Sequence, residues 1–255
     1  MTLSDAFILG IIQGITEFLP ISSSGHLVLA QELLGVNIPG NVFEVATHLG
    51  TLLSVIFVFW KEITAIFKTI QTADTQKYIF YLLIGTIPAV IVGLSGKDFI
   101  SSLFDSIQIV SGALIFTGIV LLITQKLNEK KEKLSWKKSA VIGVAQAIAI
   151  IPGISRSGMT ISTSFALGIS GKEAAKFSFL LAIPVIFGAG LLTALDVRSG
   201  GIKLIPFPQL IMAFSSSFAV GYISLKWLLG LLESGKFHRF GYYCITVGIT
   251  TYFMV

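Results

Sequence analysis

The sequence predicts an all-α integral membrane protein with six transmembrane helices and two re-entrant helical hairpins, arranged as inverted-topology repeats. Of the 255 residues, 54% are hydrophobic and 12% are charged, and the mean hydropathy is +0.87. This composition leaves too little polar surface for a soluble domain. Six apolar runs are long enough to cross a bilayer, and one polar motif occurs twice. We expect the whole chain, 1–255, to form a single membrane domain.

The duplicated motif lies inside apolar sequence, at residues 13–25 and 146–158. The offset between the copies is constant, because 146 minus 13 gives 133 residues. It divides the chain into a first repeat of about 1–125 and a second of about 126–255. Each copy is an apolar half-helix broken by a Pro/Gly/Ser turn, which hydrocarbon tolerates only where protein or water satisfies the freed backbone groups. The two turns are therefore expected to line a polar cavity.

The broken segments, residues 3–35 and 137–168, are predicted to be re-entrant hairpins, because each half is too short to cross the bilayer. Unbroken apolar runs of roughly 17–25 residues match a hydrocarbon core of about 30 Å and are predicted to be full spans. In chain order these runs are 42–60, 78–94, 107–125, 173–196, 208–231 and 239–255. Three of them separate the hairpins, so the second hairpin should enter from the opposite face and meet the first near mid-membrane.

Basic residues predict which loops face the cytoplasm. One face collects Lys61, Lys68, Lys77, Lys126, Lys130, Lys131, Lys133, Lys137, Lys138, Lys172, Lys236 and Arg239. The other face holds Lys97, Arg198 and Lys203. The positive-inside rule therefore places both termini outside and the 126–138 loop in the cytoplasm. A basic run beside a membrane usually anchors to anionic lipid, so nucleic acid is not expected as a partner.

The first tip carries an ionisable group at a depth where such groups are rare. Gln13 and Glu17 are four residues apart and share a helical face just before Pro20 stops the helix. A carboxylate in mid-membrane is costly and is a functional candidate by default. The helix that restarts near His26 offers free backbone N–H groups and a positive dipole end, both suited to an anion.

The second tip carries a permanent cation. Arg156 stands where the first copy has Ser23, and apolar residues replace Glu17 and His26. The planar guanidinium suits phosphate oxygens. The groups expected to bind phosphate around it are Ser155, Ser157, Gly158 and Thr160, and those of the first tip are Ser22, Ser24 and Gly25. A phosphate clamp would thus face a Glu/Gln pair able to hold a divalent metal.

This constellation suggests phosphoryl transfer, with Ser23 and His26 close enough to attack or to move protons. Alternatively, Glu17 and Arg156 only neutralise one another in a packed interior. Glu44 and His48, also four residues apart, could extend the metal or proton network or simply solvate a helix end.

The motif Gln-x-x-x-Glu followed by Phe-Leu-Pro-Ile-Ser-Ser-Ser-Gly-His, and the later Pro-Gly-Ile-Ser-Arg-Ser-Gly-Met-Thr, resemble those of the bacterial undecaprenyl-diphosphate phosphatases, also called bacitracin-resistance proteins. The resemblance covers essentially the whole chain. It implies an enzyme of the bacterial inner membrane that removes the terminal phosphate of a polyprenyl diphosphate carrier lipid and recycles it for cell-wall synthesis. It also suggests an active site open to the outer face.

The resemblance places the family's functional residues on Gln13, Glu17, Ser23, His26, Ser155, Arg156 and Thr160. Members carry Glu or Gln at the first of these positions. With Gln13 the motif supplies one negative charge, so Glu17 must do most of the work of holding Mg²⁺ or Ca²⁺. Ser23 is the expected nucleophile with His26 as base or acid, although His26 could itself accept the phosphoryl group.

Other functions fit the same architecture. A secondary transporter or lipid flippase would use inverted repeats with broken helices meeting at the midplane. A membrane scaffold would need the polar turns only for close helix packing. The sequence leaves open whether the chain acts alone or as a homodimer.

Overall fold

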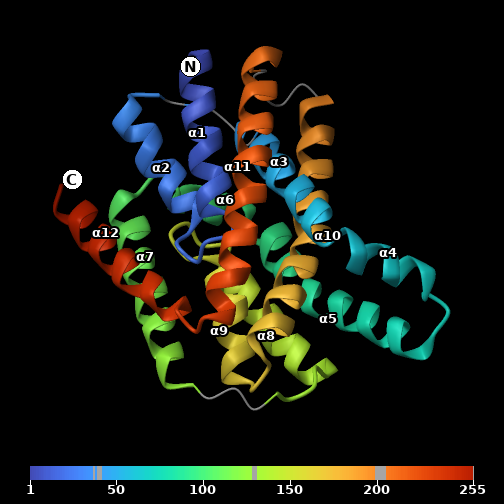
Figure 1. Ribbon diagram of the computed structural model, residues 1–255. Helices are drawn as coiled ribbons and strands as arrows, with labels where there is room; N and C mark the ends of the chain where they lie inside the picture. The colour runs from blue at the N-terminus through green and yellow to red at the C-terminus, as the bar shows by residue number, and fades with distance from the viewer. Residues whose placement is uncertain (37, 39–41, 128–130, 199–204, 255) are drawn as a thin grey trace.

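The computed structural model describes residues 1–36, 38, 42–127, 131–198 and 205–254, and this part of the chain is helical without strands (Figure 1). The helices are α1 Leu3–Thr16, α2 Ser23–Leu34, α3 Val42–Val58, α4 Trp60–Lys68, α5 Ala73–Ser95, α6 Lys97–Leu103, α7 Ile107–Ile123, α8 Trp136–Ile148, α9 Arg156–Ala166, α10 Gly171–Arg198, α11 Phe207–Glu233 and α12 Phe240–Met254. Two 3₁₀ turns, η1 Thr124–Lys126 and η2 Phe237–Arg239, follow α7 and precede α12.

Four of the described helices are long and apolar enough to cross a membrane, namely α5, α7 with η1, α10 and α11. The pair α3 and α4, bent by 69°, makes a fifth span if it is counted as one. The protein is therefore a multi-pass membrane protein, as predicted, and the count of six spans stays a prediction. Two of the expected spans, 42–60 and 239–255, are not found as single long helices, and each difference has a physical reason. The chain leaves helical geometry at Phe59 (φ −98°, ψ 23°), and α12 has 15 residues, because Arg239 belongs to η2 and Val255 lies outside the described part of the chain.

The two duplicated segments are interrupted where the sequence predicts. α1 and α2 are separated by residues 17–22, and α8 and α9 by residues 149–155. The helix starts repeat at the sequence offset, because 136 minus 3, 156 minus 23 and 240 minus 107 each give 133. The helix caps repeat as well: Thr2 and Ser135 cap the first helix of each pair, and Ser22 and Ser155 cap the second. Hydroxyl caps satisfy N–H groups that the helix itself leaves free.

Each interrupted segment packs against a helix of the other half of the chain. α1 lies along α11, α8 along α5, and α7 along α12 (Figure 1). Glycines permit these approaches: a Cβ added to Gly143 would lie 2.6 Å from the carbonyl oxygen of Gly85, and one added to Gly14 would lie 2.9 Å from the amide nitrogen of Gly221. Such backbone contact between helices is typical of membrane bundles. The two halves are thus interlocked.

An aromatic core supports the first tip. Phe18, Phe177 and Phe179 are buried in one cluster, and the rings of Phe18 and Phe179 meet edge to face with centroids 5.6 Å apart. Phe18 directly follows Glu17, so this packing fixes the backbone that carries the carboxylate.

Some residues used in the sequence predictions lie outside the described part of the chain. They are Lys130 and Lys203, which were counted for the orientation, and Val255, the end of the last predicted span.

Candidate active site

The tips of the two interrupted segments touch. Ser157 Oγ donates to the carbonyl oxygen of Leu19 at 3.4 Å, and a Cβ added to Gly25 would lie 3.1 Å from the Cα of Gly153. Each tip is also held from the side. Thr117 Oγ1 donates to the carbonyl oxygen of Gly153 at 3.0 Å, and the Cys244 thiol lies 3.6 Å from that of Pro20. Helices α7 and α12 thereby fix the turns at which the chain is not helical.

The Glu17 carboxylate lies at the centre of the contact. Its Oε1 pairs with the Arg156 guanidinium, and the two side chains are only 5% and 17% exposed. Its Oε2 accepts from Gln13 Nε2 at 3.0 Å and from Ser23 Oγ at 2.7 Å, and lies 3.4 Å from His48 Nε2. α1, α2, α3 and α9 each contribute to this cluster. A buried carboxylate with this many partners is held in one orientation.

Glu44 and His48, which the sequence predicted to act as a pair, have different roles in the structure. His48 reaches the cluster, whereas Glu44 contributes its backbone carbonyl oxygen, which lies 2.7 Å from His48 Nδ1. Because a carbonyl only accepts, His48 Nδ1 carries a hydrogen in this contact.

Two buried atoms of the cluster have no hydrogen-bond partner in the described part of the chain: Gln13 Oε1 and Arg156 Nη1. An unpaired buried polar atom costs about 1–3 kcal/mol. The first is an oxygen that a cation would satisfy, and the second is a donor that a phosphate oxygen would satisfy. The cluster could therefore bind a cation at Gln13 Oε1 and a phosphate oxygen at Arg156 Nη1.

The remaining hydroxyls at the second tip shape the helix that carries Arg156. Ser155 Oγ accepts from the Gly158 amide at 3.0 Å and lies 3.2 Å from Ser157 Oγ. Thr160 Oγ1 donates to the Arg156 carbonyl oxygen at 2.8 Å and lies 2.6 Å from Ser178 Oγ. These side chains are buried, and they place Arg156 on the first turn of α9.

The first tip repeats this cap with a strained backbone. Ser22 Oγ accepts from the Gly25 amide at 3.3 Å and lies 3.3 Å from Ser24 Oγ. Ser22 has φ 68° and ψ 102°, whereas its counterpart Ser155 has φ −77° and ψ 120°. A non-glycine residue at positive φ costs roughly 1–3 kcal/mol and is typical of functional sites. The Ser22 carbonyl oxygen lies 3.2 Å from the amide nitrogen of His26, as that of Ser155 lies 2.8 Å from the amide of Met159, and it also lies 2.8 Å from His26 Nδ1.

The sequence suggested that His26 would pair with Ser23, but the two side chains have different partners in the structure. Ser23 Oγ donates to Glu17, and the second ring nitrogen of His26 lies 2.9 Å from the hydroxyl of Tyr243. The rings of His26 and Tyr243 are nearly parallel, at 11°, with centroids 5.6 Å apart. The ionisable group in contact with Ser23 is therefore the carboxylate of Glu17. Sequence reasoning missed Tyr243, because it lies 217 positions from its partner and the duplication pairs it with Val110.

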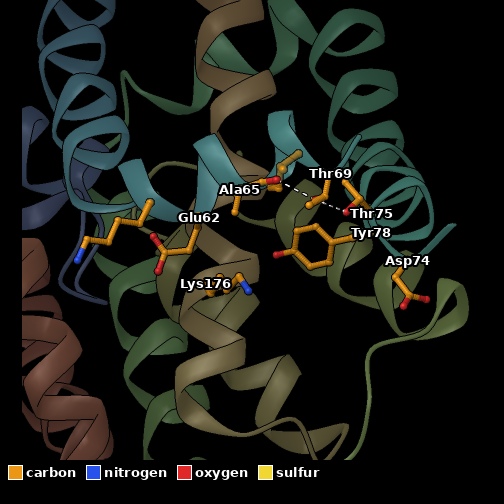
Figure 2. A pocket seen from close by; sticks show the side chains of 9 residues that line it. Glu62, Ala65, Thr69, Asp74, Thr75, Tyr78 and Lys176 are labelled. Carbon is orange, nitrogen blue, oxygen red and sulfur yellow. Dashed lines mark hydrogen bonds between the residues drawn. The ribbon is translucent and has the colours of Figure 1, made fainter. Parts of the chain in front are cut away.

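A cavity of about 450 Å³ lies between α4, α5 and α10, and Figure 2 shows Tyr78 and Lys176 within it. Its charged lining residues are Lys61, Lys176, Glu62 and Asp74. Two acidic residues offset the two lysines, so the cavity does not suit a diphosphate. None of the predicted site residues lines it. The hairpin tips remain the candidate active site.

Comparison with known proteins gives consistent matches along the chain. A family model described as "Bacitracin resistance protein BacA" matches residues 6–250. An "Undecaprenyl-diphosphatase" of Halothermothrix orenii is 42% identical over 254 residues, covering 98% of this chain and 96% of the relative. A protein of the same name from Bacteroides thetaiotaomicron is 38% identical over 257 residues, with 98% and 97% covered. An "Undecaprenyl-diphosphatase 2" of Bacillus thuringiensis is 40% identical over 255 residues, with 96% and 94% covered. With its two motifs joined at one carboxylate and its likeness extending over nearly the full length, the chain belongs to the bacitracin resistance protein BacA family.

Proposed function

We propose that this protein hydrolyses undecaprenyl or another polyprenyl diphosphate to the monophosphate and inorganic phosphate. This reaction would recycle the carrier lipid for cell-wall synthesis and give resistance to bacitracin. The observation that carries the proposal is the joined cluster of Glu17, Ser23 and Arg156, in which Arg156 Nη1 is buried and unpaired. The names of the relatives support the same reaction.

Ser23 is the proposed nucleophile, and Glu17 is the base that accepts its proton at 2.7 Å. Ser23 Oγ attacks the terminal phosphorus, the bond to the bridging oxygen breaks, and the lipid monophosphate leaves with that electron pair. Water then attacks the phosphoserine, Ser23 Oγ leaves and recovers its proton from Glu17, and His26 takes the proton of the water. Arg156 stabilises the negative charge on the transferred group.

A phosphorylated enzyme identifies the nucleophile. Label trapped on Ser23 and an inactive Ser23→Ala variant are expected. Label on His26 would assign the nucleophile to the imidazole instead, and full activity of Ser23→Ala would remove Ser23 from the reaction.

A divalent cation, Mg²⁺ or Ca²⁺, is the proposed cofactor. The buried Gln13 Oε1 is a free oxygen ligand beside Glu17. No group of three or more His, Cys, Asp and Glu side chains that could hold a metal occurs among the described residues. The residues therefore fit a cation that takes most of its oxygen ligands from the diphosphate and few from the protein. When bound, such an ion would offset charge on the phosphate oxygens.

The proposed topology places the protein in the bacterial inner membrane, with both termini outside and the site open to the outer face. The two repeats are proposed to be inverted, to contribute six spans and two re-entrant segments, and to form one domain. The repeated helix starts and the exchange of packing partners between the halves support this arrangement.

Phosphate release from purified protein in detergent tests the function, because no transport can be scored there. Wild type should release phosphate from polyprenyl diphosphate, and a chelator should stop it. Glu17→Ala and Ser23→Ala should be inactive, and Arg156→Ala should lose roughly a thousandfold. Failure of the wild type to release phosphate would favour a transporter or flippase.

A further inference from the structure

The contacts of His26 fix which of its nitrogens can carry a proton. Nδ1 lies 2.8 Å from the carbonyl oxygen of Ser22, and a carbonyl can only accept. Nδ1 therefore bears a hydrogen. In the neutral ring Nε2 is then an acceptor, and the group 2.9 Å away that can donate to it is the hydroxyl of Tyr243.

Tyr243 belongs to a helix that already holds this tip. Its neighbour Cys244 contacts the carbonyl oxygen of Pro20, and α12 packs along α7. Two consecutive residues of α12 thus reach opposite ends of the same turn, at Pro20 and at His26. The strained Ser22 carbonyl fixes one side of the imidazole and Tyr243 fixes the other.

The hydroxyl of Tyr243 serves both protonation states of the ring. It donates to Nε2 when His26 is neutral, and it can accept from Nε2 when the ring is charged. A phenylalanine could keep the contact between the two rings, whose centroids are 5.6 Å apart, but it could neither donate a hydrogen bond to Nε2 nor accept one from it. Because Nδ1 already bears its hydrogen, Nε2 is the ring nitrogen that can gain a proton, and the Tyr243 hydroxyl then changes from donor to acceptor.

We propose that Tyr243 is a positioning residue that holds the direction of the His26 imidazole, whose tautomer the Ser22 carbonyl fixes. The proposal rests on the proposed function, in which His26 takes the proton of the attacking water. Partners that orient a metal-bound histidine typically matter by about 10–100-fold, and for the hydrogen bond from Tyr243 to His26 we expect the lower end of that range. Tyr243 acts through His26, so its effect should appear in the chemical step rather than in substrate binding.

The test compares Tyr243→Phe with Tyr242→Phe, which changes the adjacent and 59% exposed tyrosine of the same helix. Tyr243→Phe should lower kcat about tenfold and leave KM and the thermal unfolding midpoint close to wild type, whereas Tyr242→Phe should change none of them. In a His26→Asn background, Tyr243→Phe should cause no further loss. An unchanged kcat, or an equal loss with and without His26, would overturn the proposal.

A spectroscopic measurement decides the matter even if no phosphate is released. The chain has three histidines, so ¹⁵N-histidine NMR in detergent can assign the His26 ring by comparison with His26→Asn. Wild type should show the Nδ1–H tautomer, and Tyr243→Phe should keep that tautomer but shift the Nε2 resonance, because Nε2 loses its hydrogen-bond partner. Identical His26 spectra in wild type and Tyr243→Phe would reject the inference. An inactive wild type with the expected spectra would reject only the proposed function.

Discussion

At the scale of single residues, the site depends on charges and backbone angles that compensate one another. Glu17 is buried and tolerated because Arg156, Gln13, Ser23 and His48 surround it. Removing one partner of a buried ion pair leaves the other uncompensated, which costs about 3–5 kcal/mol. Structure and chemistry therefore share the same atoms, and a variant that loses activity must also be checked for folding.

The pair Glu17 and Arg156 allows the two roles to be separated. Arg156→Ala should lose roughly a thousandfold in activity and should have a lower thermal unfolding midpoint, because the Glu17 carboxylate is left buried without its counter-charge. Glu17→Gln combined with Arg156→Ala should recover most of the midpoint while activity stays absent. Phosphate release and thermal unfolding in the same detergent measure both. Recovery of activity in the double variant would show that the pair serves only packing.

The strain at Ser22 gives a second prediction, with its duplicate as the control. Ser22→Gly removes the penalty of φ 68°, which offsets the lost cap, so its unfolding midpoint should match or exceed that of wild type. Ser155→Gly loses the same kind of cap at φ −77°, where glycine relieves nothing, and should be less stable. Equal midpoints for the two variants would mean that Ser22 is not strained.

At the scale of elements, interruption and close packing place the tips. The sequence predicted both interruptions, because Pro20, Pro152 and the clustered serines disrupt helices by local rules. It did not predict the bend between α3 and α4, since an apolar run does not say where a helix bends. The partner of His26 was missed for a related reason. Tyr243 comes from a helix far along the chain, and only tertiary packing brings it there.

Glycine contacts between helices can be tested one at a time. Gly143→Ala should destabilise the protein by about 1–3 kcal/mol, because its Cβ would lie 2.6 Å from a carbonyl of α5 and would push α8 away. Gly112→Ala in α7, where an added Cβ meets nothing within 4 Å, should be neutral or slightly stabilising. Thermal unfolding of the two variants side by side decides this. A neutral Gly143→Ala would mean that α8 and α5 are free to separate.

At the scale of the whole molecule, the two halves depend on each other. Each interrupted segment packs on a helix of the opposite half, and the cluster around Glu17 exists only where both tips meet. The first half supplies Glu17, Ser23 and His26, and the second supplies Arg156 and Tyr243. In the proposed mechanism the first half of the duplicated scaffold supplies the acid–base groups and the second supplies the anion-binding arginine, so neither motif alone identifies the chemistry.

The proposed orientation of the protein in the membrane rests on its lysines and can be measured directly. Each basic residue near an anionic inner leaflet contributes about 1 kcal/mol, so the excess around 126–138 should hold that loop in the cytoplasm. The sole cysteine, Cys244, is 0% exposed and should not react with a membrane-impermeant maleimide, which makes wild type the blank. Ser4→Cys, on the exposed start of α1, should label in intact cells, whereas Lys133→Cys should label only after the membrane is permeabilised. Labelling of Lys133→Cys from outside would reverse the orientation and, with it, the face from which the lipid diphosphate enters.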